Sequence, residues 1–269
     1  MHIKVALEKA AREREQAKRT HSHHTSPKRD VAGLPQYTAS IHLPFDPKIA
    51  RNNRCVSLEP DSAEASCYKV LRTKIHLQAQ KKNLKTVAIT SPCSGEGKTL
   101  TTVNLALSFA QAYDRTVLVV DCDLKRQGVH KILGIDSRIG LTDYLLGARS
   151  LPEVIVWPGI EKLTLISGGG PSANSAELLD SHRMKDLVAE LKNRYDNRII
   201  LFDTAPLLGG ADTLSLLPLA DCTIMVVAEG KTIMSDIRNA MQVVPTDKFL
   251  GFVVNRQRKN ASGSYNYYY

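Results

Sequence analysis

The sequence lacks any apolar run of the roughly eighteen residues that a membrane-spanning helix needs. Its N-terminus is charged rather than apolar, so we expect no signal peptide. Cysteine is also scarce, since five cysteines among 269 residues show no metal-ligand spacing and come in an odd number. This usage is typical of reduced thiols in the cytosol and argues against disulfides and structural zinc. We therefore expect a cytoplasmic protein.

The composition favours one folded domain with less ordered ends. Hydrophobic residues make up 43% and charged residues 23% of a chain long enough for one large α/β domain. The formal net charge of +9 is compatible with nucleic acid, acidic lipid or an acidic partner. We predict four segments: a basic, largely disordered arm with a short helix (1–59), a helix that could mediate oligomerisation (60–82), the main domain (83–256) and a flexible tyrosine-rich tail (257–269).

A phosphate-binding loop is predicted near the start of the main domain. A strand over 86–90 runs into a turn of small residues, and an amphipathic helix follows directly. Small residues let main-chain N–H groups converge on phosphates, a lysine can reach the β and γ oxygens, and a threonine hydroxyl can ligate Mg²⁺. The first glycine of the usual GxxxxGK[ST] pattern is replaced by Pro92. We assign binding of the nucleotide, ATP, to a run of seven residues, Ser94, Gly95, Glu96, Gly97, Lys98, Thr99 and Leu100.

Two later strands end in carboxylates. The run over 116–120 is continuously apolar, as in a strand buried on both faces of a parallel sheet, and Asp121 and Asp123 follow it. Their spacing points both side chains the same way, at the edge where open α/β sheets bind ligands. Such carboxylates suit Mg²⁺ ligation or proton abstraction from an attacking hydroxyl. A second apolar run, over 199–202, ends in Asp203 and is typical of a Walker B strand.

The rest of the chain alternates strands with helices, which favours an α/β fold with a doubly wound, mostly parallel sheet. Asp212, at the start of one helix, is either an acid behind the site or a helix cap, and the sequence leaves both open. The helix over 60–80 packs either on the core or on a neighbouring subunit. We predict further strands over 163–166, 222–228 and 249–254, and helices over 98–113, 127–133, 141–146, 175–195 and 235–244.

The last five residues contain four of the nine tyrosines, outside any element that could bury them. A disordered end without function is the alternative interpretation, because compositional bias alone rarely proves function. The four residues concerned are Tyr265, Tyr267, Tyr268 and Tyr269.

With a P-loop, two acidic strand ends and a terminal tyrosine cluster, the sequence resembles the bacterial tyrosine kinases. More narrowly, it is similar to the cytoplasmic autokinases of capsular and exopolysaccharide export. The stretch 94–99 matches the family's Walker A motif, 117–125 its second acidic motif, and 199–203 its Walker B motif. The resemblance implies a P-loop NTPase fold of the MinD/ParA-like type, with 83–256 as the kinase domain. It also implies an ATP-dependent protein-tyrosine autokinase that regulates polysaccharide synthesis and export.

Residue roles follow from the same resemblance. Lys98, Asp121 and Asp123 are implied as catalytic residues, and Thr99, Asp121 and Asp203 as metal ligands. The tail tyrosines named above would be the phosphoacceptors. The family further implies a membrane-embedded chain-length regulator as activator, a homo-oligomer, a cognate tyrosine phosphatase, and a place at the inner face of the cell membrane through the partner. No nucleic acid is expected as a partner.

The sequence departs from the family at two informative places. Where the family has an arginine two residues after the second aspartate of this motif, this chain has Lys125 followed by Arg126. In the family's ring-forming helix, a glutamate and two arginines recur at three-residue spacing. The corresponding residues here are Ser66, Lys69 and Arg72, so only the last is kept.

Two other functions fit the same pattern. One is a MinD/ParA-like ATPase that scaffolds DNA or membrane, but such proteins carry a lysine five residues before the P-loop lysine, where this chain has Cys93. The other is a nucleotide-binding regulatory subunit of a polysaccharide export complex that transfers no phosphate.

Overall fold

The computed structural model describes residues 40–112 and 115–257. All of them belong to Tyr37–Tyr269, one of two compact units into which the chain divides. The predictions for residues 1–39 and for the tail tyrosines lie outside the described residues.

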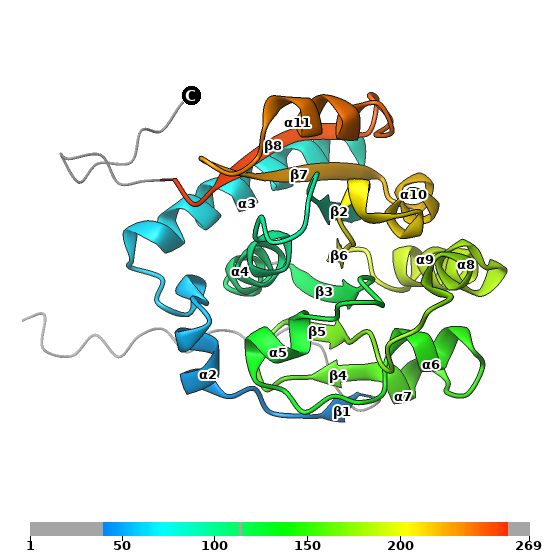
Figure 1. Ribbon diagram of the computed structural model, residues 1–269. Helices are drawn as coiled ribbons and strands as arrows, with labels where there is room; N and C mark the ends of the chain where they lie inside the picture. Colours follow the sequence, from blue (N-terminus) through cyan, green and yellow to red (C-terminus); the bar gives the residue numbers. More distant parts are fainter. Residues whose placement is uncertain (1–39, 113–114, 258–269) are drawn as a thin grey trace, which may run out of the picture. The chain divides into compact units, whose positions relative to one another are not determined.

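A mostly parallel sheet forms the centre of this part of the chain, and its strand order is β1-β4-β5-β3-β6-β2-β7-β8 (Figure 1). Every neighbouring pair is parallel except β4 and β5. The mostly parallel sheet predicted from the alternating pattern is therefore confirmed. Its strands are β1 (Ile41–His42), β2 (Thr86–Thr90), β3 (Thr116–Asp121), β4 (Ile155–Trp157), β5 (Leu163–Ile166), β6 (Arg198–Asp203), β7 (Cys222–Ala228) and β8 (Phe249–Asn255).

Helices cover both faces of the sheet, as Figure 1 shows. The helices α3, α4 and α5 pack in one apolar cluster, and α6 to α11 pack in the other. The helices are α2 (Pro47–Asn52), α3 (Ala63–Lys82), α4 (Lys98–Ala110), α5 (Val129–Leu133), α6 (Leu141–Leu145), α7 (Leu151–Val154), α8 (Ser175–Asp180), α9 (His182–Arg194), α10 (Asp212–Leu216) and α11 (Met234–Met241), with 3-10 turns η1 (Val56–Leu58), η2 (Leu207–Gly209) and η3 (Leu217–Leu219).

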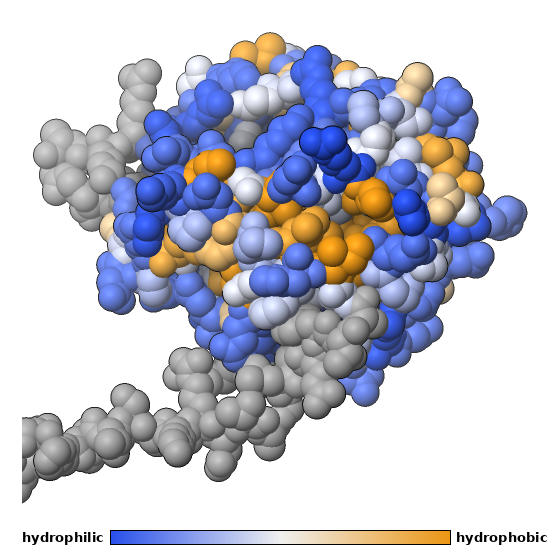
Figure 2. All heavy atoms as spheres, turned by 90° about the horizontal axis from the view of Figure 1, so that it is seen from below, coloured by the Kyte–Doolittle hydropathy of each residue, from blue (hydrophilic) through white to orange (hydrophobic). Residues whose placement is uncertain are grey.

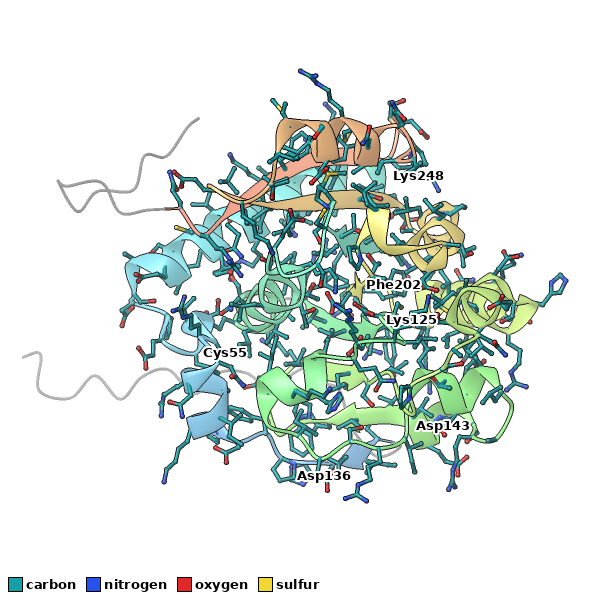
Figure 3. The ribbon with its side chains drawn as sticks, viewed as in Figure 1. Cys55, Lys125, Asp136, Asp143, Phe202 and Lys248 are labelled. Carbon is teal, nitrogen blue, oxygen red and sulfur yellow. The ribbon has the colours of Figure 1, made fainter. Side chains whose placement is uncertain are left out.

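The central strands divide their side chains between the two apolar clusters. Along β3, Val117 and Val119 join the cluster under α4, whereas Leu118 and Val120 join the opposite cluster. Successive strand residues point to opposite faces, so a strand covered on both sides needs apolar residues at every position. Phe202, just before the acid of β6, is fully buried on the second face (Figure 3).

The structure differs from the prediction in two places. Residues 40–59 were expected to belong to a largely disordered arm, yet they form β1, α2 and η1, and Ala50 and Cys55 are buried. The single helix expected over 175–195 is two helices. Ser181 is extended between them (φ −63°, ψ 156°), and its hydroxyl accepts a hydrogen bond from Met184 N at 3.2 Å, which caps α9.

Among the described helices, none combines enough length and hydropathy to cross a bilayer. Apolar side chains do reach the surface near the β1 edge of the sheet, on the face that Figure 2 displays. Ile41 of β1 and Ile49 of α2 are 41% and 42% exposed there. All five cysteines lie in the described part of the chain and are free thiols.

Candidate functional site

The P-loop connects β2 to α4 at the carboxyl edge of the sheet. Two glycines give the loop its shape, since Gly95 (φ 78°) and Gly97 (φ 95°) lie in the left-handed region that favours glycine. Helix α4 starts at Lys98, and its N-cap Gly97 offers no side-chain bond to the first turn. The free N–H groups and the positive end of the helix dipole therefore face the space in front of the loop, which suits an anion.

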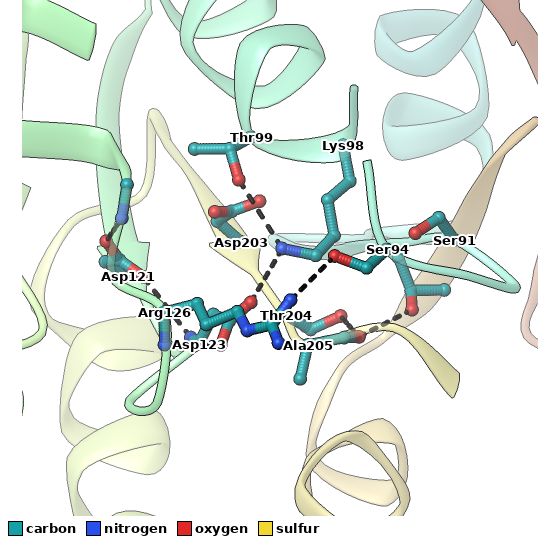
Figure 4. A network of polar contacts seen from close by, with 12 residues as sticks. Ser91, Ser94, Lys98, Thr99, Asp121, Asp123, Arg126, Asp203, Thr204 and Ala205 are labelled. Atoms are coloured by element: carbon teal, nitrogen blue, oxygen red, sulfur yellow. Dashed lines mark hydrogen bonds and ion pairs between the residues drawn. The ribbon is translucent and has the colours of Figure 1, made fainter. Parts of the chain in front are cut away.

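Lys98 is held by carboxylates at this position. Its Nζ lies 2.8 Å from Asp123 Oδ2 and 3.4 Å from the Thr99 hydroxyl (Figure 4). Burial lowers the pKa of Lys98, but the negative charges of Asp203 and Asp123 outweigh it and hold the pKa above its usual value. Lys98 therefore carries a full positive charge at neutral pH.

Asp121 and Asp203 are brought together by the register of the sheet, because they pair across β3 and β6. Both are fully buried. Asp121 accepts main-chain hydrogen bonds from Asp123 at 3.2 Å, Gly128 at 2.9 Å and Val129 at 3.1 Å, so it also fixes the turn that follows β3. Burial and then the neighbouring Asp203 raise the pKa of Asp121. Two adjacent carboxylates that are both buried need a nearby cation if both are to stay ionised.

Asp203 has an oxygen to offer such a cation. Its Oδ1 accepts from the Thr102 hydroxyl at 3.2 Å, whereas its buried Oδ2 has no hydrogen-bond partner among residues 40–112 and 115–257. Burial raises the pKa of Asp203, against the charge of Lys98. In the described part of the chain no three His, Cys, Asp or Glu side chains form a metal cage. Mg²⁺ needs none, because it keeps several waters and takes its other ligands from one or two carboxylates and phosphates. The Thr99 hydroxyl and Asp203 fit that ion.

Behind Asp123 the chain places two further cations. Asp123 Oδ1 accepts from Arg126 N at 3.0 Å, and the Arg126 guanidinium donates to Ser94 Oγ of the P-loop at 3.3 Å (Figure 4). The side chain of Lys125 points to α10 instead, where its Nζ lies 2.9 Å from Asp212 Oδ2 (Figure 3). Of the two adjacent cations, Arg126 is therefore the one that reaches the P-loop.

Asp212 is buried behind the site rather than capping its helix. The N-cap of α10 is Ala211, and Asp212 Oδ1 accepts from the Ser175 hydroxyl at 2.6 Å. Together with Lys125, this carboxylate ties the turn after β3 to α10 and α8. Of the two interpretations left open by the sequence, the acid behind the site is the one that the hydrogen bonds favour.

Glu96 is the predicted loop residue whose side chain faces away from the anion site. It is 1% exposed, its Oε2 accepts from Cys93 N at 2.9 Å, and its Oε1 accepts from the Thr232 hydroxyl. Its contribution to the site is therefore made by its main chain. Leu100, in the first turn of α4, is partly exposed.

Sequence reasoning missed three side chains that contact the P-loop from outside. Lys231 follows β7, Asn255 ends β8 and Arg256 comes next, and each donates to a P-loop carbonyl. Their position after apolar strands at the ligand-binding edge was the only available signal, because the bonds join residues more than 130 positions apart.

Known proteins share this architecture. Residues 87–267 match the CobQ/CobB/MinD/ParA nucleotide binding domain. The chain is 34% identical to tyrosine-protein kinase YwqD of Bacillus subtilis (strain 168), over 81% of this chain and 92% of that protein. It is also 34% identical to tyrosine-protein kinase CpsD of Streptococcus pneumoniae serotype 4 (strain ATCC BAA-334 / TIGR4), over 70% and 82% respectively. Tyrosine-protein kinase ptk of Acinetobacter johnsonii is 31% identical over 72% of this chain, which spans only 26% of that longer protein.

Solved structures agree with these relatives. The kinase domain of Escherichia coli tyrosine kinase ETK has a TM-score of 0.72 at 25% identity, over 88% of this chain and 95% of that chain. MinD from Pyrococcus horikoshii OT3, complexed with Mg-ADP, has a TM-score of 0.53 at 26% identity, over 66% and 72%. Fold and site thus define a P-loop nucleotide-binding domain of the MinD/ParA-like class. Within that class, the chain belongs to the bacterial tyrosine-protein kinases.

Proposed function

We propose that this chain is an ATP-dependent protein-tyrosine autokinase that transfers the γ-phosphate of ATP to its own C-terminal tyrosines. The phosphoacceptors are the residues predicted above, Tyr265, Tyr267, Tyr268 and Tyr269. The observation that carries the proposal is the buried Lys98–Asp123 pair, with 2.8 Å between Nζ and Oδ2, at the start of a helix and within the field of the Asp203 carboxylate. This arrangement supplies the charge and positioning that phosphoryl transfer needs.

The residues divide the work as follows. The P-loop N–H groups and Lys98 would hold the β and γ phosphates, and Thr99 and Asp203 would hold the metal, with Asp121 alongside. Mg²⁺, when bound, neutralises charge on the phosphate oxygens. A tyrosine oxygen forms a bond to the γ phosphorus while the bond from that phosphorus to the β-phosphate oxygen breaks. The tyrosine proton goes to a carboxylate, for which Asp121 and Asp123 are the candidates.

Arg126 adds a second cation to this site. Its guanidinium reaches from the turn after Asp123 to Ser94 Oγ of the P-loop, at 3.3 Å. Charge developing on the transferred group is stabilised by arginine contacts of this kind.

We also propose that the kinase regulates capsular or exopolysaccharide synthesis and export. Its activator is a membrane-embedded chain-length regulator, and a cognate tyrosine phosphatase removes the phosphates. The active form is a homo-oligomer at the inner face of the cell membrane. The longer relative supports the first partner, because a protein about four times the matched length carries further segments in the same chain. A separate regulator can supply such segments here.

Incubation with γ-labelled ATP and Mg²⁺, followed by mapping of phosphotyrosine, tests the activity. Label on the four tail tyrosines is the expected result. Release of inorganic phosphate without labelled protein would indicate the ATPase alternative. That alternative has less support, because the residue at the place of its lysine, Cys93, is a thiol that donates to Asp236 at 3.4 Å. Nucleotide binding without either reaction would indicate a regulatory subunit.

A further inference from the structure

The outer face of the P-loop is held by side chains from another part of the fold. In such a loop the N–H groups converge on the phosphates, so the carbonyls of the same peptide units point away. Here three consecutive carbonyls each accept a hydrogen bond. Ser94 O accepts from Lys231 Nζ at 2.7 Å, Gly95 O from Arg256 Nη2 at 2.7 Å, and Glu96 O from Asn255 Nδ2 at 2.8 Å.

The donors are themselves held in place at the ends of β7 and β8. Asn255 O accepts from Glu229 N at 2.9 Å, which joins the two strand ends. Asn255 Oδ1 accepts from Arg256 N at 2.8 Å, and Arg256 is in the left-handed region at φ 59°. The Thr232 hydroxyl, one residue after Lys231, donates to the buried Glu96 side chain. The loop and the two strand ends therefore form one hydrogen-bonded unit.

Both P-loop glycines lie directly against these donors. A Cβ at Gly97 would overlap the Asn255 amide, and a Cβ at Gly95 would lie 2.8 Å from Lys231 Nζ. The left-handed backbone favours glycine at both positions, and at Gly97 the Asn255 amide also leaves no space for a Cβ, whereas the flexible Lys231 side chain can move away from Gly95.

Each bond acts on an N–H that faces the anion. The carbonyls of Ser94, Gly95 and Glu96 belong to the same peptide units as the N–H groups of the residues that follow them, 95, 96 and 97. A donor bonded to the oxygen polarises the peptide unit and makes its N–H a stronger donor, more so when that donor is a cation. It also fixes the direction of the N–H before the ligand arrives, which is electrostatic preorganisation.

We propose that Lys231, Asn255 and Arg256, here called the carbonyl clamp, are positioning residues of the phosphate site, and that Arg256 makes the root of the tyrosine tail part of that site. The inference rests on the proposed function in one respect, that the anion is the phosphate chain of an adenine nucleotide.

Nucleotide binding to the full chain tests the clamp. The variants are Lys231→Ala and Arg256→Ala, their conservative partners Lys231→Arg and Arg256→Lys, and Arg138→Ala as a control that removes a charge from an exposed ion pair elsewhere. For each we would measure the Kd of MgADP, the KM and kcat for MgATP, and the thermal midpoint without nucleotide. A hydrogen bond contributes about 1 kcal/mol, so each alanine variant should raise Kd and KM about fivefold. The kcat should fall as well, by a smaller factor than Kd and KM rise, because most of the lost stabilisation acts on the bound phosphates and only part on the charge that develops during transfer.

Two truncations separate the tail's root from the rest of the tail. Ending the chain after Gln257 keeps Arg256 and should leave the Kd of MgADP unchanged. Ending it after Asn255 removes Arg256 and puts the terminal carboxylate at Asn255, so it should raise the Kd at least as much as Arg256→Ala does.

Unchanged MgADP affinity in both alanine variants would overturn the clamp. The clamp would also be overturned if the conservative variants recovered none of the lost MgADP affinity. The same holds if affinity fell only in variants whose thermal midpoint also fell, because either result indicates general destabilisation. If an alanine variant does not fold, the conservative variant and the truncation pair still decide. Absence of tyrosine labelling in wild type would overturn only the proposed kinase activity, since MgADP binding measures the clamp without it.

Discussion

At the scale of single residues, the Lys98–Asp123 pair determines how Lys98→Met affects both stability and phosphate transfer. The two side chains are only 10% and 5% exposed, so Lys98→Met leaves the Asp123 carboxylate buried without its cation. Breaking a buried pair in this way costs on the order of 3–5 kcal/mol. Loss of a phosphate-site cation should also reduce tyrosine labelling by about 10³-fold or more. We expect both a lower thermal midpoint and a loss of transfer.

A double variant separates these two effects. Lys98→Met combined with Asp123→Asn removes the unpaired charge, so thermal unfolding should return towards wild type while tyrosine labelling stays absent. Labelling at the parent rate in Lys98→Met would show that this lysine is not part of the phosphate site.

Asp221 gives a pH-dependent prediction away from the site. Burial raises the pKa of Asp221, but hydrogen bonds from Lys192 at 2.6 Å and from the main-chain N–H groups of Lys85 and Thr86 outweigh it, and the pKa lies below its usual value. Since the folded pKa is depressed, the carboxylate stabilises the fold above the unfolded value of about 4, and this contribution is lost as the pH falls through the folded pKa.

Urea unfolding at two pH values measures that contribution. Asp221→Asn should lower the free energy of unfolding at pH 7 by roughly 1–3 kcal/mol, because it removes a charge-assisted bond. The difference from wild type should shrink at pH 2–3. Asp180→Asn, which breaks a pair with an exposed carboxylate, is the control and should change little at either pH. An equal loss at both pH values would contradict the assignment.

At the scale of elements, the sequence predicts those whose pattern is long and continuous. Strands β2, β3, β6 and β7 are buried at every position. Strands buried on both faces have continuous apolar sequences, and these runs made the parallel sheet predictable. Strands β1 and β4 have two and three residues, too few for any periodicity. The break at Ser181 was not predicted, because apolar residues recur at helical spacing on both sides of it and serine also occurs inside helices.

The residues of the candidate site also differ in how far the sequence predicts them. Lys98, Asp121 and Asp203 were predictable because chain order alone brings carboxyl ends of parallel strands to one edge. The hydrogen-bond partners of Glu96 and Asp212 come from residues far apart in sequence. Lys125 and Arg126 point in different directions for the same reason, because each is held by a distant residue. Polar side chains of this kind carry no periodic signal.

Helix α3 yields a prediction about assembly. The three residues at the family's ring-forming positions all bond within their own chain. Arg72 Nη1 donates to Ser108 O at 2.7 Å, Lys69 Nζ to Pro60 O at 2.6 Å, and the Ser66 hydroxyl to Ser62 O at 3.1 Å. Arg72→Ala should therefore lower the free energy of unfolding by about 1 kcal/mol and leave the mass in solution unchanged. Light scattering coupled to size exclusion checks this, and dissociation of an assembly by Arg72→Ala or Lys69→Ala would contradict it.

At the scale of the whole molecule, the proposed phosphoacceptors raise the question whether a kinase site labels the tail of its own chain or that of another. The last strand ends at Asn255, whose amide contacts the P-loop, and Tyr265 lies ten positions further along the chain. Ten residues span at most about 35 Å when extended, which allows transfer within one chain or between chains. If the clamp holds Arg256 at its own P-loop, the tail starts beside its own site and must leave it to reach a neighbour. Each phosphate adds roughly −1.5 to −2 charges, so several on one tail repel the acidic sites around them and favour release.

A mixing experiment determines the direction of transfer. One protein carries Lys98→Met and keeps its tail, and the other is active but ends after Asn260, so it has no tail tyrosine. Because the first cannot transfer and the second cannot accept, label on the tail requires transfer between chains. We expect such label, with an initial rate that rises with the concentration of the truncated protein, as a bimolecular step must. Wild type alone, which should label itself, is the positive control. An unlabelled tail in the mixture, beside a labelled control, would restrict transfer to the chain's own tyrosines.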